Sequence, residues 1–272
     1  MTEFYEQVKE RLMRYARINT ESNPHSTSVP TTSCQHDLAS VIYEELQKIG
    51  ATNVYYDKDT CVVYGSLEAN VKTGRAIGFV THMDTAPDAS GKDVKPWVLE
   101  HYDGNDIVLN KEKDIVMSPK VFPNLKQYIG QDLVLTDGTT LLGGDDKASI
   151  AAVMTLLEYL VKHPESKHNF ISVAFTPDEE VSGLAKNLDL ERFKSPIAYT
   201  LDGDHLGYYM DETFNASLST IEIHGISVHT ATAKGIMKNA VDIGNEFLNK
   251  LPALEKPQYT QGREGFYHVV SF

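Results

Sequence analysis

The hydrophobic pattern of the chain changes repeatedly between helical and strand-like spacing. Apolar residues recur at helical spacing over residues 3–17 and again over 36–49, where Gly50 ends the pattern, so both stretches are predicted to be amphipathic helices. Residues 148–160 are apolar nearly all round, which predicts a buried helix. A further short helical stretch is expected over 184–193.

Runs of β-prone residues alternate with these helices. Two short runs over 54–56 and 61–64 predict a hairpin, and a longer strand is expected over 75–81. Residues 169–176 are almost continuously apolar or β-prone, as in a strand covered on both faces, and another strand is expected over 197–201. The alternation predicts an α/β fold in which a layered mixed sheet is flanked by helices.

A long stretch between Asp84 and Asp145 interrupts this rhythm. It is rich in proline and glycine, and its β-prone runs are short, at 106–109 and 133–136. Long excursions of this kind in compact domains often form the lids or walls of functional sites.

The pattern changes again after Gly207. A strand is predicted over 216–224, a helix over 236–251 and a strand over 266–272. We interpret this β-α-β segment as the start of a smaller α+β domain, with the boundary near Leu206. The expected division is therefore a first domain over 1–206 and a second over 207–272.

Composition restricts the classes of partner. The chain has 272 residues with 41% apolar content, which is enough for a substantial core, and a formal net charge of −13. This charge argues against nucleic acid and anionic membranes as partners, because both are bound by basic patches. Cys34 and Cys61 lack the spacing of a disulfide framework or a cysteine zinc site, and no apolar run reaches the ~20 residues that span a bilayer. A cytoplasmic protein is expected.

Potential metal ligands directly follow the predicted strands. These are His82 and Asp84 after the strand ending at Thr81, Glu179 and Glu180 after the strand ending at Thr176, and Asp202 after the strand ending at Leu201, with Asp145 at the start of the buried helix. In open α/β sheets the ligand crevice lies outside the carboxyl ends of the strands. We therefore expect these side chains to lie close together.

The chemistry of this set suits a catalytic metal. One histidine with several carboxylates is a donor set typical of zinc, cobalt or manganese, and histidine makes calcium a weaker candidate. So many acids are compatible with two metals about 3.5–4 Å apart. Taken singly each residue has an ordinary explanation: Asp145 as a helix cap, for example. Their joint occurrence at successive strand ends favours the metal site.

Four segments carry a resemblance to a known family. They are THMDTAP at 81–87, TDGTTLLGGDDKAS at 136–149, TPDEEVSG at 176–183 and YTLDGD at 199–204. In residues, order and spacing they are similar to the metal motifs of the peptidase T family, the tripeptide aminopeptidases of the di-zinc aminoacylase/carboxypeptidase clan. Residues 229–241, HTATAKGIMKNAV, resemble the lid motif of that family, although Thr230 and Ala231 replace its usual Pro-Gly.

The resemblance implies a role for each matching residue. Two zinc ions are implied. His82 and Asp202 would be ligands of one ion, Glu180 would be a ligand of the other, and Asp145 would bridge the two. Asp84 would orient His82, and Glu179 would be the general base. His229 would reach the substrate from the lid. Co²⁺ or Mn²⁺ would be substitutes for Zn²⁺.

The resemblance also implies an activity and an expectation about length. The implied reaction is hydrolysis of the N-terminal peptide bond of a tripeptide, with small peptides as substrates and a homodimer formed through the lid domain. The alternatives are another amidohydrolase of the clan, either a dipeptidase or an N-acyl amino acid deacylase, and a non-catalytic fragment. Family members run well beyond residue 272, so the chain is expected to be truncated within the lid, without the last histidine ligand.

Overall fold

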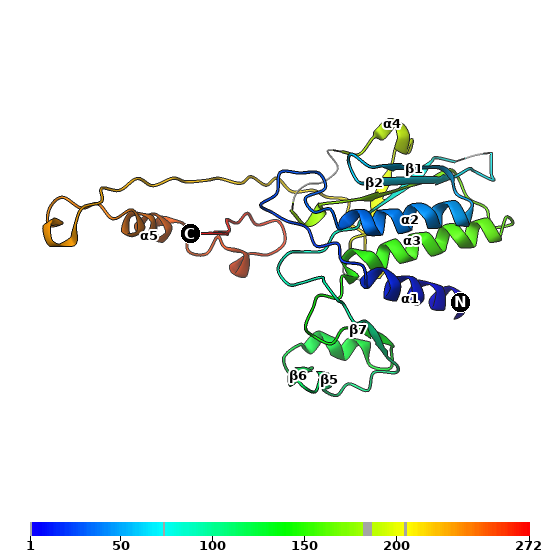
Figure 1. The fold of residues 1–272 in the computed structure, drawn as a ribbon, viewed down its shortest axis with the longest axis horizontal. Coiled ribbons are helices and arrows are strands. Elements are labelled where there is room, and N and C mark those ends of the chain that lie inside the picture. The colour runs from blue at the N-terminus through cyan, green and yellow to red at the C-terminus, as the bar shows by residue number, and fades with distance from the viewer. Residues whose placement is uncertain (1, 73, 182–186, 204–205) are drawn as a thin grey trace. The chain divides into compact units, whose positions relative to one another are not determined.

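A computed structural model describes residues 2–72, 74–181, 187–203 and 206–272 (Figure 1). The chain divides into two compact units, Met1–Tyr209 and Met210–Phe272. Each unit is described by itself below. Assigning catalysis to residues 1–206 and a lid role to 207–272 stays a prediction.

The first unit is built on a five-stranded mixed sheet with the order β1-β2-β8-β3-β9. Its strands are β1 (Thr52–Asp57), β2 (Val62–Leu67), β3 (Ile77–His82), β8 (Ile171–Thr176) and β9 (Ala198–Thr200). The pairs β1–β2 and β2–β8 are antiparallel, while β3 is parallel to both β8 and β9. The predicted hairpin, strands and mixed sheet are confirmed.

Helices cover both faces of this sheet (Figure 1). On one face lie α1 (Thr2–Ala16), α2 (Gln35–Ile49) and α3 (Gly144–Lys162), which share a core with inward-facing strand residues such as Val63, Val173 and Phe175. On the opposite face Phe193 of α4 (Leu190–Phe193) packs with Val62, Tyr64 and Ala174. Because strand side chains alternate between faces, β2 and β8 are buried on both sides, as the continuous apolar run of β8 predicts.

The excursion after Asp84 forms a small body with its own core. It contains two short antiparallel pairs, β4 (Trp97–Leu99) with β7 (Leu133–Leu135) and β5 (Ile107–Asn110) with β6 (Ile115–Met117), and a 3-10 helix over Pro123–Tyr128 lies between β6 and β7 in the chain. Tyr102, Ile107, Leu125 and Leu135 form its buried cluster. Both predicted β-prone runs are therefore strands here.

The second unit corrects two predictions. Its helix is α5 (Ala240–Lys250), begun by Asn239, whose side chain accepts the backbone N–H of Val241. The strands predicted over 216–224 and 266–272 are wrong: both segments are irregular and largely exposed in the described structure. A β-strand is stable only when its backbone is paired with a neighbour, and the described part of this unit contains a single isolated bridge, between Ile226 and Lys238.

Parts of three predicted features lie outside the described residues. Of the helix expected over 184–193, residues 184–186 are not described, and the helical part observed is α4. The last two residues of the TPDEEVSG motif, 182 and 183, and Asp204 at the end of YTLDGD also lie outside the described residues.

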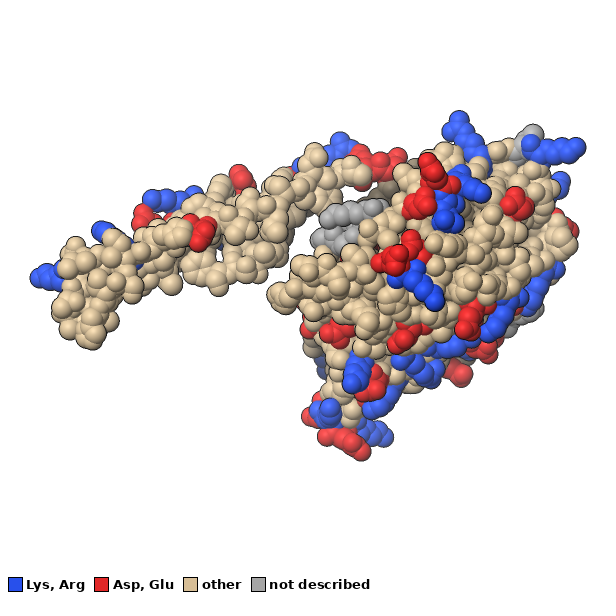
Figure 2. All heavy atoms as spheres, turned by 45° about the horizontal axis from the view of Figure 1, so that its top comes forward, with Lys and Arg blue, Asp and Glu red and all other residues tan. Residues whose placement is uncertain are grey.

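Charge is not gathered by sign on the face of the first unit that Figure 2 shows. On the face drawn in Figure 2, the basic and acidic side chains of the first unit are interspersed. None of the helices described is both long and apolar enough to cross a membrane.

The buried thiol of Cys61 gives a testable dependence of stability on pH. Burial raises the pKa of Cys61 from 9.0 to about 12, although a hydrogen bond with Tyr56 opposes this shift. The folded protein therefore keeps a proton that the unfolded chain loses, so this contribution to stability is present below pH 9 and is lost as the pH rises toward 12.

We expect Cys61→Ala to remove that part of the pH dependence. Between about pH 8 and pH 10 the free energy of unfolding of the unaltered protein should fall by about 1 kcal/mol more than that of the variant. Urea unfolding at the two pH values measures the difference. Cys34→Ala, at a half-buried cysteine, is the matched control and should keep the full fall. Equal falls with and without Cys61 would contradict the prediction.

Candidate metal centre

The candidate site lies where three parallel strands end. Strands β3, β8 and β9 run in the same direction, so their carboxyl ends meet at one edge of the sheet. His82 is the last residue of β3, and Asp202 follows two residues after β9. Asp145 lies in the non-helical first turn of α3. The topology thus brings together side chains that are far apart in the sequence.

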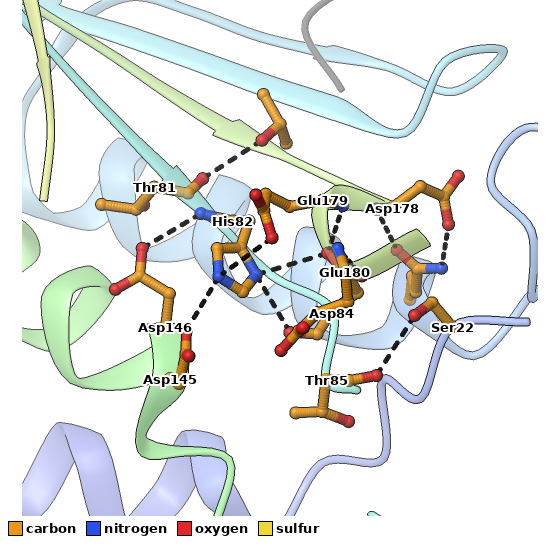
Figure 3. Close-up of polar contacts among 12 residues, drawn as sticks. Ser22, Thr81, His82, Asp84, Thr85, Asp145, Asp146, Asp178, Glu179 and Glu180 are labelled. Carbon is orange, nitrogen blue, oxygen red and sulfur yellow. Dashed lines mark hydrogen bonds and ion pairs between the residues drawn. The ribbon is translucent and has the colours of Figure 1, made fainter. Parts of the chain in front are cut away.

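His82 is at the centre of this group (Figure 3). Its side chain is 3% exposed, and Nε2 lies 2.9 Å from Oδ1 of Asp145 and 3.7 Å from Oδ2 of Asp202. His82, Asp145 and Asp202 each offer a ligand atom within 4.8 Å of the others, so these three residues could hold a metal ion. The carboxylates are more open than the histidine, since the Asp145 side chain is 69% exposed. A cation held here would be reached from the carboxylate side.

The fully buried carboxylate of Asp84 lies beside Nδ1 of His82, the ring nitrogen that does not face Asp145. Its Oδ1 lies 3.4 Å from Nδ1 of His82, and that ring nitrogen is also 3.2 Å from the backbone carbonyl oxygen of Asp84. The same carboxylate accepts the backbone N–H groups of Glu179 and Glu180, at 2.9 and 3.1 Å. Asp84 therefore fixes both the histidine ring and the acidic turn, which is the arrangement that orients a metal-binding histidine in proteins.

The two adjacent glutamates start a short 3-10 helix over Glu179–Val181. Oε2 of Glu179 lies 4.0 Å from Nε2 of His82. Glu180 is half-buried beside the site, but it is not one of the three residues whose ligand atoms converge. Burial raises the pKa of both glutamates; the positive charge of His82 opposes this, and neighbouring carboxylates add to it.

The electrostatics of the site favour a cation. Burial lowers the pKa of His82, but the hydrogen bond to Asp84 and the charges of Asp84, Asp146 and Glu179 outweigh it and raise the pKa to about 10. A proton on this ring is thus stabilised by an excess of carboxylates. A divalent cation would supply the same compensation, and one nitrogen with several carboxylate oxygens is a suitable donor set for zinc, cobalt or manganese.

His229, the predicted lid histidine, belongs to the second unit. It is exposed, and its Nδ1 accepts the backbone N–H of Ala231 at 3.2 Å, which starts the short 3-10 helix over Thr230–Thr232. The second unit is described by itself, so the role of His229 at the substrate stays a prediction.

Sequence reasoning missed two buried carboxylates beside the site. Oδ2 of Asp146 accepts the backbone N–H of His82 at 3.2 Å, and burial raises the pKa of Asp146 to about 7. Asp178, 2% exposed, hydrogen-bonds to Thr31 and Gln35. For Asp178 the available signal was the acidic run over 178–180, because adjacent residues of a turn point in different directions.

Comparison with known proteins agrees with this geometry. The chain is 48% identical to peptidase T of Caldanaerobacter subterraneus over 97% of its own length and 65% of that protein. It is 49% identical to peptidase T of Geobacillus kaustophilus over 98% of its length and 65% of that protein. The chain is similar to peptidase T over nearly its whole length. It spans about 65% of the length of these curated relatives.

Two further comparisons concern the fold. The family model described as "Peptidase dimerisation domain" matches residues 212–271. Among solved structures, aminopeptidase PepT from Bacillus cereus has a TM-score of 0.57 and 21% identity, and covers 91% of this chain and 57% of its own. A tripeptidase from Staphylococcus aureus has a TM-score of 0.58 and 18% identity, covering 94% of this chain and 58% of its own. At these identities the two structures show a shared fold, which confirms the predicted fold class.

Proposed function

We propose that this chain is the metal-dependent part of an aminopeptidase that hydrolyses the N-terminal peptide bond of tripeptides. The observation that carries the proposal is the convergence of His82, Asp145 and Asp202 at the strand ends, with Glu179 beside them. The names of the similar proteins support the substrate class. We further propose a cytoplasmic location.

The proposed cofactor is a pair of zinc ions, for which Co²⁺ or Mn²⁺ could substitute. His82, Asp145, Asp202 and Glu180 would hold the ions, with Asp145 shared between them, and Asp84 would orient His82. The exposed face of Asp145 and Asp202 leaves room for additional ligands and for substrate. When bound, the metal would supply Lewis-acid polarisation of the scissile carbonyl and would lower the pKa of a water nucleophile.

The residues of the chain would perform the proton transfers. Glu179 takes the proton of the attacking water at its carboxylate and later gives it to the leaving amine. Its raised pKa suits both steps, because a base that must also act as an acid works best when its pKa approaches the working pH. Asp84 keeps this turn in place through the two backbone N–H groups that it accepts.

The direct test is hydrolysis of an unblocked tripeptide by the full-length polypeptide that carries this sequence. We expect release of the N-terminal residue, loss of activity after treatment with a chelator, and recovery on addition of Zn²⁺, Co²⁺ or Mn²⁺. Identification of products by mass spectrometry separates aminopeptidase from carboxypeptidase cleavage. Release of the C-terminal residue, or turnover that a chelator leaves unchanged, would contradict the proposal.

The alternatives share the metal site and differ in the substrate. A dipeptidase or an N-acyl amino acid deacylase would use the same ligands, so a panel of dipeptides, tripeptides and N-acetyl amino acids distinguishes them. A non-catalytic fragment would bind metal without turnover of any member of the panel.

We also propose that residues 207–272 form a homodimer interface and bring His229 to the substrate. The match of residues 212–271 to a dimerisation domain supports the first part. Phe214, Leu218 and Val270, which are strongly exposed, would be covered in such an interface. Because Nδ1 of His229 accepts a backbone N–H, Nε2 is the ring nitrogen that would donate to a substrate oxygen.

A further inference from the structure

We infer that Asp178 is a positioning residue: its buried carboxylate ties the acidic turn at 179–180 to the loop and helix start at 31–35, and so fixes the general base. Only the kinetic test of this inference rests on the proposed function. The tie itself consists of hydrogen bonds present in the structure and can be measured independently of turnover.

The side-chain hydrogen bonds of Asp178 go to Thr31 and Gln35 and not to the residues of the metal centre. Its two carboxylate oxygens accept the backbone N–H of Thr31 at 3.0 and 2.9 Å, and Oδ1 also accepts the Thr31 hydroxyl at 2.5 Å. Oδ1 further accepts Nε2–H of Gln35 at 2.7 Å, while the backbone N–H of Asp178 donates to Oε1 of Gln35 at 3.2 Å. Asp178 is 2% exposed and Gln35 is fully buried. A buried carboxylate is stable here because several donors surround it.

The backbone conformation explains why this residue controls the turn. Asp178 has a φ of 63°, in the left-handed region that non-glycine residues rarely adopt, although Asp is one of the more tolerant types. The chain leaves β8 at Thr176 and turns at Asp178, so the directions of Glu179 and Glu180 depend on this conformation. The side-chain hydrogen bonds hold it in place. Asp84 holds the same turn as well, because its carboxylate accepts the backbone N–H groups of Glu179 and Glu180.

The segment held by Asp178 is linked to the loop at 20–22, because the Thr32 hydroxyl donates to the backbone carbonyl of Glu21 at 2.7 Å, and this loop is attached to the residues that follow β3. The backbone N–H of Ser22 donates to the carbonyl of Thr85 at 3.1 Å, and the N–H of Thr85 donates to the carbonyl of Thr20 at 3.1 Å. This segment and residues 87–92 line a cavity of about 560 Å³. The hydrogen bonds of Asp178 therefore connect the acidic turn to the segment that lines the cavity, and this segment is connected in turn to the residues after His82.

A pair exchange tests the tie. Asp178→Asn places an amide N–H₂ where an acceptor is required, and Gln35→Glu removes the donor and sets two carboxylates against each other. In the double variant the new amide can donate to Glu at position 35 while its oxygen still accepts the Thr31 N–H. We expect each single change to lower kcat for tripeptide hydrolysis by about 10–100-fold with a smaller change in KM, the scale known for partners of metal ligands. The double variant should recover most of the loss.

Asp178→Gly separates the effect of the side-chain hydrogen bonds from the effect of the backbone conformation. Glycine adopts a positive φ readily, so this variant keeps the turn accessible but removes every side-chain hydrogen bond. We expect a loss of kcat as large as that of Asp178→Asn. The matched control is Asp57→Asn, which alters a carboxylate that accepts the N–H groups of Asp59 and Thr60 in the β1–β2 turn, and it should leave kcat unchanged.

The readout besides activity is amide hydrogen exchange of residues 20–35 and 177–181 in the full-length polypeptide. Faster exchange in both segments in each single variant and recovery in the double variant would support the tie, even if tripeptides are not the substrate. Unchanged exchange in both segments would overturn it. If exchange follows the expected pattern but kcat of the active protein stays at the unaltered value in the single variants and in Asp178→Gly, the positioning role is wrong.

Discussion

Glu179→Gln is expected to lower kcat for tripeptide hydrolysis by about 10²–10⁴ while leaving the metal content unchanged. The substitution keeps the size and polarity of the side chain but removes the group that accepts a proton. Glu179 is not one of the proposed ligands His82, Asp145, Asp202 and Glu180, which the variant leaves unaltered, and its Oε2 is 4.0 Å from Nε2 of His82. The metal should therefore stay bound. Steady-state kinetics together with elemental analysis of the purified variant measure both quantities.

The matched control for this experiment is Glu191→Gln, the same substitution at an exposed position of α4. It should leave kcat and metal content as they are. Full activity of Glu179→Gln would remove this residue from the mechanism, and loss of metal from the variant would instead make Glu179 a ligand.

Asp145→Ala is expected to remove most of the bound metal. Its carboxylate lies 2.9 Å from Nε2 of His82 and is proposed to be shared between two ions, so its loss weakens both sites. Even residues that only support metal ligands contribute about 10–100-fold to affinity, and a ligand should contribute at least as much. Metal content after dialysis against metal-free buffer, followed by titration with Zn²⁺, measures the effect.

Folding should not change in this variant. The side chain of Asp145 is 69% exposed, so its removal leaves no cavity in the core. The melting temperature of the metal-free protein is therefore expected to match that of the unaltered chain. Asp59→Ala, at another exposed aspartate, is the control and should keep the full metal content. An unchanged affinity for zinc in Asp145→Ala would exclude the shared-ligand role.

Some features of the protein follow from the sequence because they depend on local spacing. The helices α1, α2 and α3 follow from the period of their apolar residues, and the end of α2 follows from Gly50, which adopts a φ of 90°. Strand β8 follows from its continuous apolar run. The convergence of His82, Asp145 and Asp202 was also expected, since parallel strands deliver the residues after them to one edge. Their catalytic and metal-binding roles remain predictions.

Other features were decided by contacts between distant parts of the chain. Apolar alternation over 216–224 indicates a strand, but a strand requires a paired neighbour, and the described structure provides none for this segment. Asp146 and Asp178 read as ordinary acids in a turn. Their carboxylates are buried because donors from β3 and from the segment at 31–35 lie beside them in the folded chain. A local pattern sets periodicity and turn preference, whereas the partner of a buried polar group depends on which elements the fold brings together.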